Sequence, residues 1–310
     1  MIGRLRLALE RIGLPAWFVA IDLLWIAKFD VLAIDSRHYQ RATNAWLAGG
    51  DPFLVAEGTT PYVSGPHTLL FYVPTSILPV TVATWIWMAF GLVASVWLIR
   101  RLELPIWWVL FPPLAHAIWN GNPQTIALAL LVFGGPLAAG AAVGLKLYTG
   151  LTLAFRWRDA LIAGVFLLVT LPFVPWQLYL EHSGSVAEHV ATSWNGSAWR
   201  FPVLIPVAAI AIWILRLEGG AWHAVGALWP GTQFYYNSMA LPAIAHRKVV
   251  TAFLAVPVPL MAPLVVIALA AKHVIDARRS STDVAHITEL GTPDPPLIDA
   301  TRPAPMSRSR

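Results

Sequence analysis

The sequence predicts an all-α membrane protein, a bundle of about ten helices, from its composition and its repeated apolar segments. Hydrophobic residues make up 57% of the 310 residues and charged residues only 12%, about half of the charged share of a typical soluble domain. So few charges cannot cover a surface that faces water. The 16 tryptophans are typical of the boundary between lipid and water, where one edge of the indole ring is hydrated.

The apolar segments give the expected helices in order. A spanning helix needs about 20 mostly apolar residues, and fewer where helices are short or broken. Candidates lie at residues 14–33, 66–80, 82–99, 105–119, 123–135, 136–155, 159–180, 201–217, 221–235 and 249–272. The first has no small-residue cleavage site and follows Arg4, Arg6 and Arg11. We therefore expect it to be retained, with its start in the cytoplasm.

Ten spans place both ends of the chain in the cytoplasm, and the distribution of arginines tests this topology. Arg156, Arg158 and Arg216 then fall in cytoplasmic loops, as basic residues usually do. Arg100 and Arg101 fall outside, against that rule. Either the 66–80 segment is re-entrant or one short helix is miscounted.

The chain divides into a predicted transmembrane domain, residues 1–275, and a predicted disordered cytoplasmic tail, residues 276–310. The tail is rich in Pro, Ser and Thr and has little to bury. Prolines also recur within the apolar segments, for example Pro112, Pro113 and Pro172. Each breaks or kinks a helix, and such breaks survive in lipid where other helices or a wet cavity satisfy the freed carbonyls. We therefore expect an interior cavity.

Composition excludes several kinds of chemistry. Cysteine is absent, which excludes disulfides, thiolate metal sites and a cysteine nucleophile. The histidines include no pair one helical turn apart, so we expect no metal site. No glycine-rich phosphate loop occurs, so we expect no nucleotide cofactor. The net charge of +5 fits basic loops beside anionic lipid, and we expect no nucleic-acid partner.

The first long polar segment, residues 34–65, follows the first helix and falls outside. In a helix that starts there, Asp35, His38 and Tyr39 share one face, while Arg37 and Arg41 form another. A carboxylate at the edge of a cavity can act as a general base for a hydroxyl, and arginines can hold a phosphate. The alternative is an interfacial amphipathic helix with solvated charges.

Several motifs follow one another along roughly residues 30–245. They are Asp35-x-x-x-Tyr39 followed by Leu47-Ala-Gly-Gly-Asp-Pro-Phe53, Pro66 to Pro79, Gly121-Asn122-Pro123-Gln124-Thr125, Ala139 to Leu147, Trp194-Asn195-Gly196-Ser197, and Leu228 to Tyr236 with Leu241-Pro242. In this order they resemble the motifs of glycosyltransferase family 87, the polyprenol-phosphate-mannose-dependent mannosyltransferases of the GT-C fold.

The resemblance implies a GT-C-like bundle in the cell membrane that transfers a sugar, mannose in most of the family, with inversion on the extracytoplasmic side. Its partners would be a polyprenyl-phosphate sugar donor, a lipid or glycan acceptor, and membrane lipids. Asp35 matches the general base. A departing phosphate needs positioned positive charge. The residues implied in binding the donor phosphate or substrate are Arg37, Tyr39, Arg41, His67, Lys146, Asn195, Arg200, Gln233 and Tyr236.

The chain also departs from the family pattern. Ser64-Gly65-Pro66 stands where the family usually has Tyr-Pro-Pro. Lys146 is followed by Leu-Tyr-Thr in place of Leu-Thr-Pro, and Tyr235-Tyr236 stands where His is frequent. These differences bear on sugar and acceptor specificity more than on fold.

Intramembrane charges leave two interpretations open. Lys146 lies in an apolar segment, where an ammonium usually faces a cavity or partner unless it extends to the interface. For Asp22, Lys28 and Asp30 in the first helix, a structural pairing is favoured. Broken helices and buried charges also occur in transporters and flippases, and a non-catalytic scaffold is a third hypothesis.

Overall fold

The computed structural model describes residues 13–26, 32–57, 60–192 and 196–290. These residues are helical apart from turns and one pair of two-residue strands, β1 (Ala56–Glu57) and β2 (Thr60–Pro61), which pair antiparallel with Ala56 opposite Pro61. The predicted all-α class is therefore confirmed. The chain divides into two compact units, the first ending at Ala270 and the second beginning at Ala271.

The helices are short for the most part, with α for α-helices and η for 3-10 helices. The first half contains α2 (Leu14–Ile26), α3 (Ile34–Leu47), η1 (Pro52–Leu54), η2 (Pro66–Thr68), α4 (Leu69–Tyr72), η3 (Val73–Thr75), α5 (Val80–Arg101), η4 (Ile106–Leu110), α6 (Pro112–Trp119), α7 (Gln124–Phe133), α8 (Pro136–Leu145) and η5 (Leu147–Leu153). The second half contains α9 (Trp157–Thr170), α10 (Trp176–Glu181), α11 (Ser183–Thr192), η6 (Ala198–Arg200), α12 (Leu204–Ile214), η7 (Arg216–Glu218), η8 (Gly220–His223), α13 (Ala224–Leu228), η9 (Phe234–Ala240), α14 (Leu241–Ile244), α15 (Lys248–Leu254) and α16 (Met261–Leu290).

One helix of the described part, α5, is long and apolar enough to cross a bilayer. Its 22 residues extend about 33 Å at 1.5 Å per residue, which matches a hydrocarbon core of about 30 Å. Shorter apolar helices occur at Leu14–Trp25, Gln124–Phe133, Pro136–Leu145 and Leu204–Ile214. The ten-span count stays a prediction.

The segment at 66–80 folds into three consecutive short turns, η2, α4 and η3, and not into one continuous helix. Pro66 begins η2 and Pro74 lies in η3, where a proline removes one backbone donor and breaks the ladder. A segment of this form is shorter than a bilayer is thick. It favours the re-entrant alternative raised by the arginine distribution.

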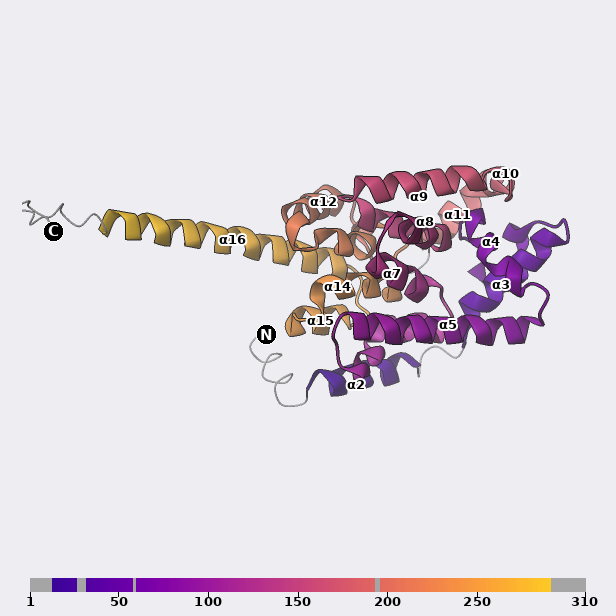
Figure 1. Cartoon of the computed structure of the whole chain (residues 1–310), viewed down its shortest axis with the longest axis horizontal. Helices are drawn as coiled ribbons and strands as arrows, with labels where there is room; N and C mark the ends of the chain where they lie inside the picture. Colours follow the sequence, from indigo (N-terminus) through magenta and orange to yellow (C-terminus); the bar gives the residue numbers. More distant parts are fainter. Residues whose placement is uncertain (1–12, 27–31, 58–59, 193–195, 291–310) are drawn as a thin grey trace, which may run out of the picture. The chain divides into compact units, whose positions relative to one another are not determined.

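A stack of aromatic rings joins α3 to α4 and α5. The ring of Tyr39 stacks on Tyr72 with centroids 5.2 Å apart, and Tyr72 stacks on Trp87 at 4.1 Å. A hydrogen bond also joins α3 to the segment after α4: Thr75 Oγ1 donates to Gln40 Oε1 at 2.6 Å. Figure 1 shows α3 and α4 beside the beginning of α5. It also shows that α7, α8 and α9 follow one another, in that order, away from α5. This packing fixes α3, which carries Asp35.

The C-terminal helix extends into the segment that was predicted to be disordered. α16 continues through residue 276 to Leu290, a difference from the predicted boundary. Prolines begin only at residue 293, and Lys272 pairs with Asp276 one turn away on the same helix, so this stretch has helix formers and a supporting ion pair. The remainder of the predicted tail, residues 291–310, lies outside the described residues.

Candidate functional site

The backbone around Asp35 is fixed by the end of α6. Ala33 N–H donates to the carbonyl of Trp119 at 2.8 Å, and Asp35 N–H donates to that of Asn120 at 3.0 Å. Gly121 allows this approach, because a Cβ there would lie 2.7 Å from Ser36 Cβ and its φ of +62° disfavours other residues. Asp35 is therefore held in the first turn of α3 by contacts from a distant part of the chain.

Asn122 orients the carboxylate of Asp35. Its Nδ2 donates to Asp35 Oδ2 at 2.7 Å and contacts the Tyr235 hydroxyl at 3.1 Å. Asn122 is only 2% exposed, so water does not compete strongly for this hydrogen bond. Asp35 Oδ1 receives no hydrogen bond from the described residues, which leaves one oxygen available to a ligand.

Lys146 is the buried cation of the site. It ends α8 in an extended conformation, and this break between α8 and η5 turns its side chain inward. Lys146 is 4% exposed, so the ammonium does not extend to an interface. Its Nζ donates to the Tyr39 hydroxyl and lies 4.5 Å from the centroid of that ring. The carboxylate of Asp35 acts on Lys146 electrostatically.

Tyr39 accepts the hydrogen bond of Lys146 and is influenced electrostatically by the carboxylate of Asp35. It lies one turn after Asp35 on α3, and its hydroxyl also bonds Ser64 Oγ at 2.7 Å. Burial, followed by the negative charge of Asp35, raises the pKa of Tyr39 well above its usual value. The phenol is therefore neutral at physiological pH and serves as a hydrogen-bonding group.

Further tyrosines close the inner wall of the site. Tyr148 OH donates to Gln124 Oε1 at 2.6 Å, and Gln124 Nε2 donates to the carbonyl of Tyr235 at 2.6 Å. The rings of Tyr148 and Tyr236 lie 4.2 Å apart. We call Asp35, Tyr39, Asn122, Gln124, Lys146, Tyr148, Tyr235 and Tyr236 the Asp35 cluster.

His67 lies beside this cluster and is fully buried. Its ring stacks on Trp176 with centroids 5.5 Å apart, and neither ring nitrogen has a hydrogen-bond partner among the described residues. Lys146 acts on His67 electrostatically. Gly65 makes room for this ring, because a Cβ at Gly65 would lie 2.2 Å from His67 Cε1. The departure from the family pattern at Ser64-Gly65 thus shapes the site.

The other implied site residues lie in several environments. Arg37 is half-buried and Arg41 is exposed, both on α3. Arg200 is exposed on η6, with no described contact to the Asp35 cluster. Gln233 precedes η9 and is half-buried. Asn195 lies outside the described residues.

Asn122, Gln124, Tyr148 and Tyr235 were not among the residues implied as a site, although they belong to the cluster. The Gly121-Asn122 turn was the signal for the first of them. The two tyrosines were noted only as departures from the family motifs, and nothing in the sequence indicated the partners of their hydroxyls.

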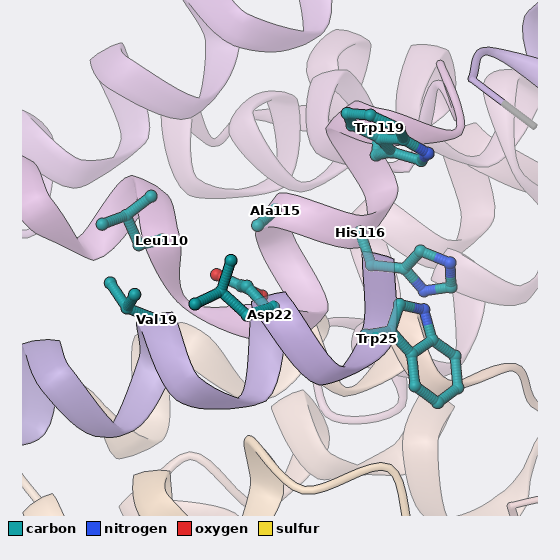
Figure 2. Close-up of a pocket in the computed structure, with 8 residues that line it drawn as sticks. Val19, Asp22, Trp25, Leu110, Ala115, His116 and Trp119 are labelled. Carbon is teal, nitrogen blue, oxygen red and sulfur yellow. The ribbon is translucent and has the colours of Figure 1, made fainter. Parts of the chain in front are cut away.

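A pocket of about 260 Å³ lies on the other side of α6, between α2, η4 and α6. Figure 2 shows Asp22 of α2 facing it, with Trp25, Trp119 and His116 at one end. His116 Nε2 bonds Asn120 Nδ2 at 3.2 Å, and its ring lies 5.5 Å from that of Tyr235. The expected pairing of Lys28 with a carboxylate inside the bundle lies outside the described residues, because Lys28 and Asp30 do.

The arrangement provides one oriented carboxylate and one buried ammonium. Among the described residues there is no group of three or more His, Asp or Glu side chains that could hold a metal. Such a pair can accept a proton from a hydroxyl and place positive charge beside an anion. No protein-family model, curated protein or solved structure matches the chain.

Proposed function

We propose that this chain is a multi-pass glycosyltransferase of the cell membrane. It transfers a hexose, mannose as the first choice, from a polyprenyl-phosphate donor to a hydroxyl of a lipid or glycan acceptor on the extracytoplasmic side. The observation that carries the proposal is that buried Lys146, at the end of α8, donates to Tyr39 one turn after Asp35 on α3, and that Asp35 acts on Lys146 electrostatically. The family resemblance supports the same reaction.

In this mechanism Asp35 is the general base. Its Oδ2 is occupied by Asn122, so Oδ1 accepts the proton of the acceptor hydroxyl. The acceptor oxygen attacks the anomeric carbon of the sugar, and the bond from that carbon to the phosphate oxygen breaks with inversion. The electron pair leaves with polyprenyl phosphate. The proton ends on Asp35 and passes to solvent when the product departs.

Lys146 supplies the charge that the departing phosphate needs. An ammonium buried without a counter-ion loses its hydration, at a cost of several kcal/mol, and Lys146 forms no ion pair with a described carboxylate. A bound phosphate would offset that cost and would gain a preorganised donor. His67, with two unpartnered ring nitrogens beside Lys146, can add a second hydrogen bond.

Exposed apolar side chains support the membrane location. Large hydrophobic residues are exposed along α5, α9 and α12, among them Trp85, Val93, Leu161, Leu168 and Ile210. Apolar surface on this scale is unfavourable in water and marks a surface that contacts another apolar phase. In a bilayer the hydrocarbon chains would cover it.

The test is sugar transfer by membranes that contain Asp35→Asn. The probe is polyprenyl phosphate mannose labelled in the sugar, with the host's membrane lipids as acceptor. We expect loss of labelled product with normal insertion and accumulation. Asp159→Asn is the matched control, because Asp159 lies on α9, pairs with Arg156 just before that helix and is outside the Asp35 cluster.

Three outcomes separate the hypotheses. Wild-type transfer by Asp35→Asn would exclude Asp35 as the base. Solute flux that persists in Asp35→Asn, with no transfer by either protein, would favour a transporter or flippase. The absence of both activities in the wild type, with every donor sugar offered, would favour a scaffold.

A further inference from the structure

Basic side chains from three separate loops meet at one end of the helical bundle. α5 and α7 run in the same direction, since Gly91 lies against Thr125 and Trp97 lies 6.2 Å from Phe133 between ring centroids. The ends of both helices therefore lie together. Arg100 and Arg101, the last residues of α5, belong to this end.

The loop before α9 reaches the same end. η5 folds back along α8, because a Cβ at Gly150 would lie 3.7 Å from Val143. The chain thus returns to the start of α8, which follows Phe133 of α7 directly. Phe155 then contacts Trp213, the penultimate residue of α12, with ring centroids 5.6 Å apart. Figure 1 shows the end of α5, the start of α9 and α12 on the side away from α3 and α10.

Two of these arginines stack on exposed tryptophans. Arg158 lies 5.3 Å from the ring centroid of Trp157, and Arg216 lies 5.1 Å from that of Trp213. The tryptophans are 69% and 59% exposed. We call Arg100, Arg101, Arg156, Arg158 and Arg216, with Trp157 and Trp213, the arginine–tryptophan end.

We propose that the arginine–tryptophan end binds the headgroups of anionic phospholipids in the cytoplasmic leaflet. Guanidinium groups match phosphate with paired donors, and indole rings favour the headgroup layer. The cytoplasmic leaflet carries negative charge that attracts clustered arginines. The arginine–tryptophan end carries Glu103, Asp159 and Glu218 beside its five arginines, so positive charge remains in excess there. At the opposite end, Asp51, Glu181 and Glu188 accompany the arginines.

This binding sets the orientation of the chain in the membrane. It also places Arg100 and Arg101 on the cytoplasmic side, where basic residues usually lie. When the 66–80 segment does not span, α5 begins outside and ends inside, and both arginines join Arg156 and Arg158 in the cytoplasm. Lys146 follows the far end of α8, so the Asp35 cluster lies toward the extracytoplasmic side. The inference uses the proposed membrane location, but it does not depend on sugar transfer.

The test compares full-length protein in nanodiscs of phosphatidylcholine with and without phosphatidylglycerol. We expect phosphatidylglycerol to raise the Tm of the wild type by several degrees. Arg158→Gln with Arg216→Gln should lose at least half of that increase. Arg200→Gln, an exposed arginine before the start of α12, should keep it. An equal increase in all three proteins, or an equal loss in Arg200→Gln, would overturn the proposal.

The orientation is tested with single cysteines, since the chain has none of its own. Leu217→Cys is beside Arg216 at a position 91% exposed, and Ser183→Cys is exposed on α11. A membrane-impermeant maleimide should label only Ser183→Cys in intact cells, and both variants after permeabilisation. Labelling of Leu217→Cys in intact cells overturns the inference. Asp35→Asn should abolish transfer while leaving both results unchanged, so the two proposals fail separately.

Discussion

Replacing Lys146 with Met should abolish most sugar transfer without destabilising the fold. Removing one positioned donor from a charge-stabilising site typically lowers kcat about 100- to 1,000-fold, or about 2.7–4 kcal/mol. We expect a loss in this range, because Lys146 is the buried ammonium of the Asp35 cluster.

The free energy of unfolding should not fall together with the rate of transfer. The hydrogen bond from Nζ to the Tyr39 hydroxyl is worth about 1.5–3 kcal/mol, but burying an ammonium without an ion pair costs several kcal/mol. Met has a similar length and no charge, and Tyr39 keeps its bond to Ser64. The free energy of unfolding should therefore stay the same or rise.

The assay measures initial rates of transfer from labelled polyprenyl phosphate mannose at a saturating donor concentration. Thermal unfolding of the same samples is followed by tryptophan fluorescence. Lys248→Met is the matched control, because Lys248 is exposed at the start of α15 and should keep wild-type transfer. A loss of transfer below about tenfold, or a loss that merely follows a fall in Tm, would refute the role given to Lys146.

Further changes in the cluster have expected outcomes of their own. Asn122→Leu removes the hydrogen bond to Asp35 Oδ2 and should lower kcat roughly 10- to 100-fold, as loss of a bond to a charged group worth about 1.5–3 kcal/mol implies; unchanged kcat would contradict the orienting role. Tyr39→Phe removes the acceptor of Lys146 and should raise the KM for the donor more than it lowers kcat, as steady-state kinetics at varied donor would show. Gly65→Ala places a Cβ 2.2 Å from His67 Cε1 and should lower stability by about 1–3 kcal/mol; denaturant unfolding that matches the wild type would show that the ring moves freely.

The sequence predicted the parts of the site whose chemistry is unusual for their surroundings. Asp35 and Lys146 were recognisable because charged residues beside or inside apolar segments need a partner or a cavity. Asn122 was recognisable only as part of a Gly-Asn turn, since an amide fits a turn as well as it fits a carboxylate. Tyr148 and Tyr235 were visible only as departures from the family motifs, and their contacts with Gln124 and Asn122 depend on the placement of their hydroxyls.

The all-α class could be predicted from the sequence, but the points at which individual helices break or end could not. Apolar composition identified helices, but hydropathy does not show where a helix breaks. The 66–80 segment is apolar enough for a span, but its prolines are typical of a series of turns. The structure has short turns there, with Pro66 at the start of η2 and Pro74 in η3. At the other end, helix-forming residues extend α16 to Leu290, although the average composition there is typical of a disordered tail.

The joining of Asn122 to both Asp35 and Tyr235 has a consequence for biosynthesis. Contacts between residues so distant along the chain form only after the later one has been made, and loop closure makes them slow to form. Asp35 leaves the ribosome early, but the tyrosine that completes its surroundings follows some two hundred residues later. A nascent chain that stops before Tyr235 therefore lacks part of the wall around its carboxylate, and a shortened fragment cannot reproduce the complete site.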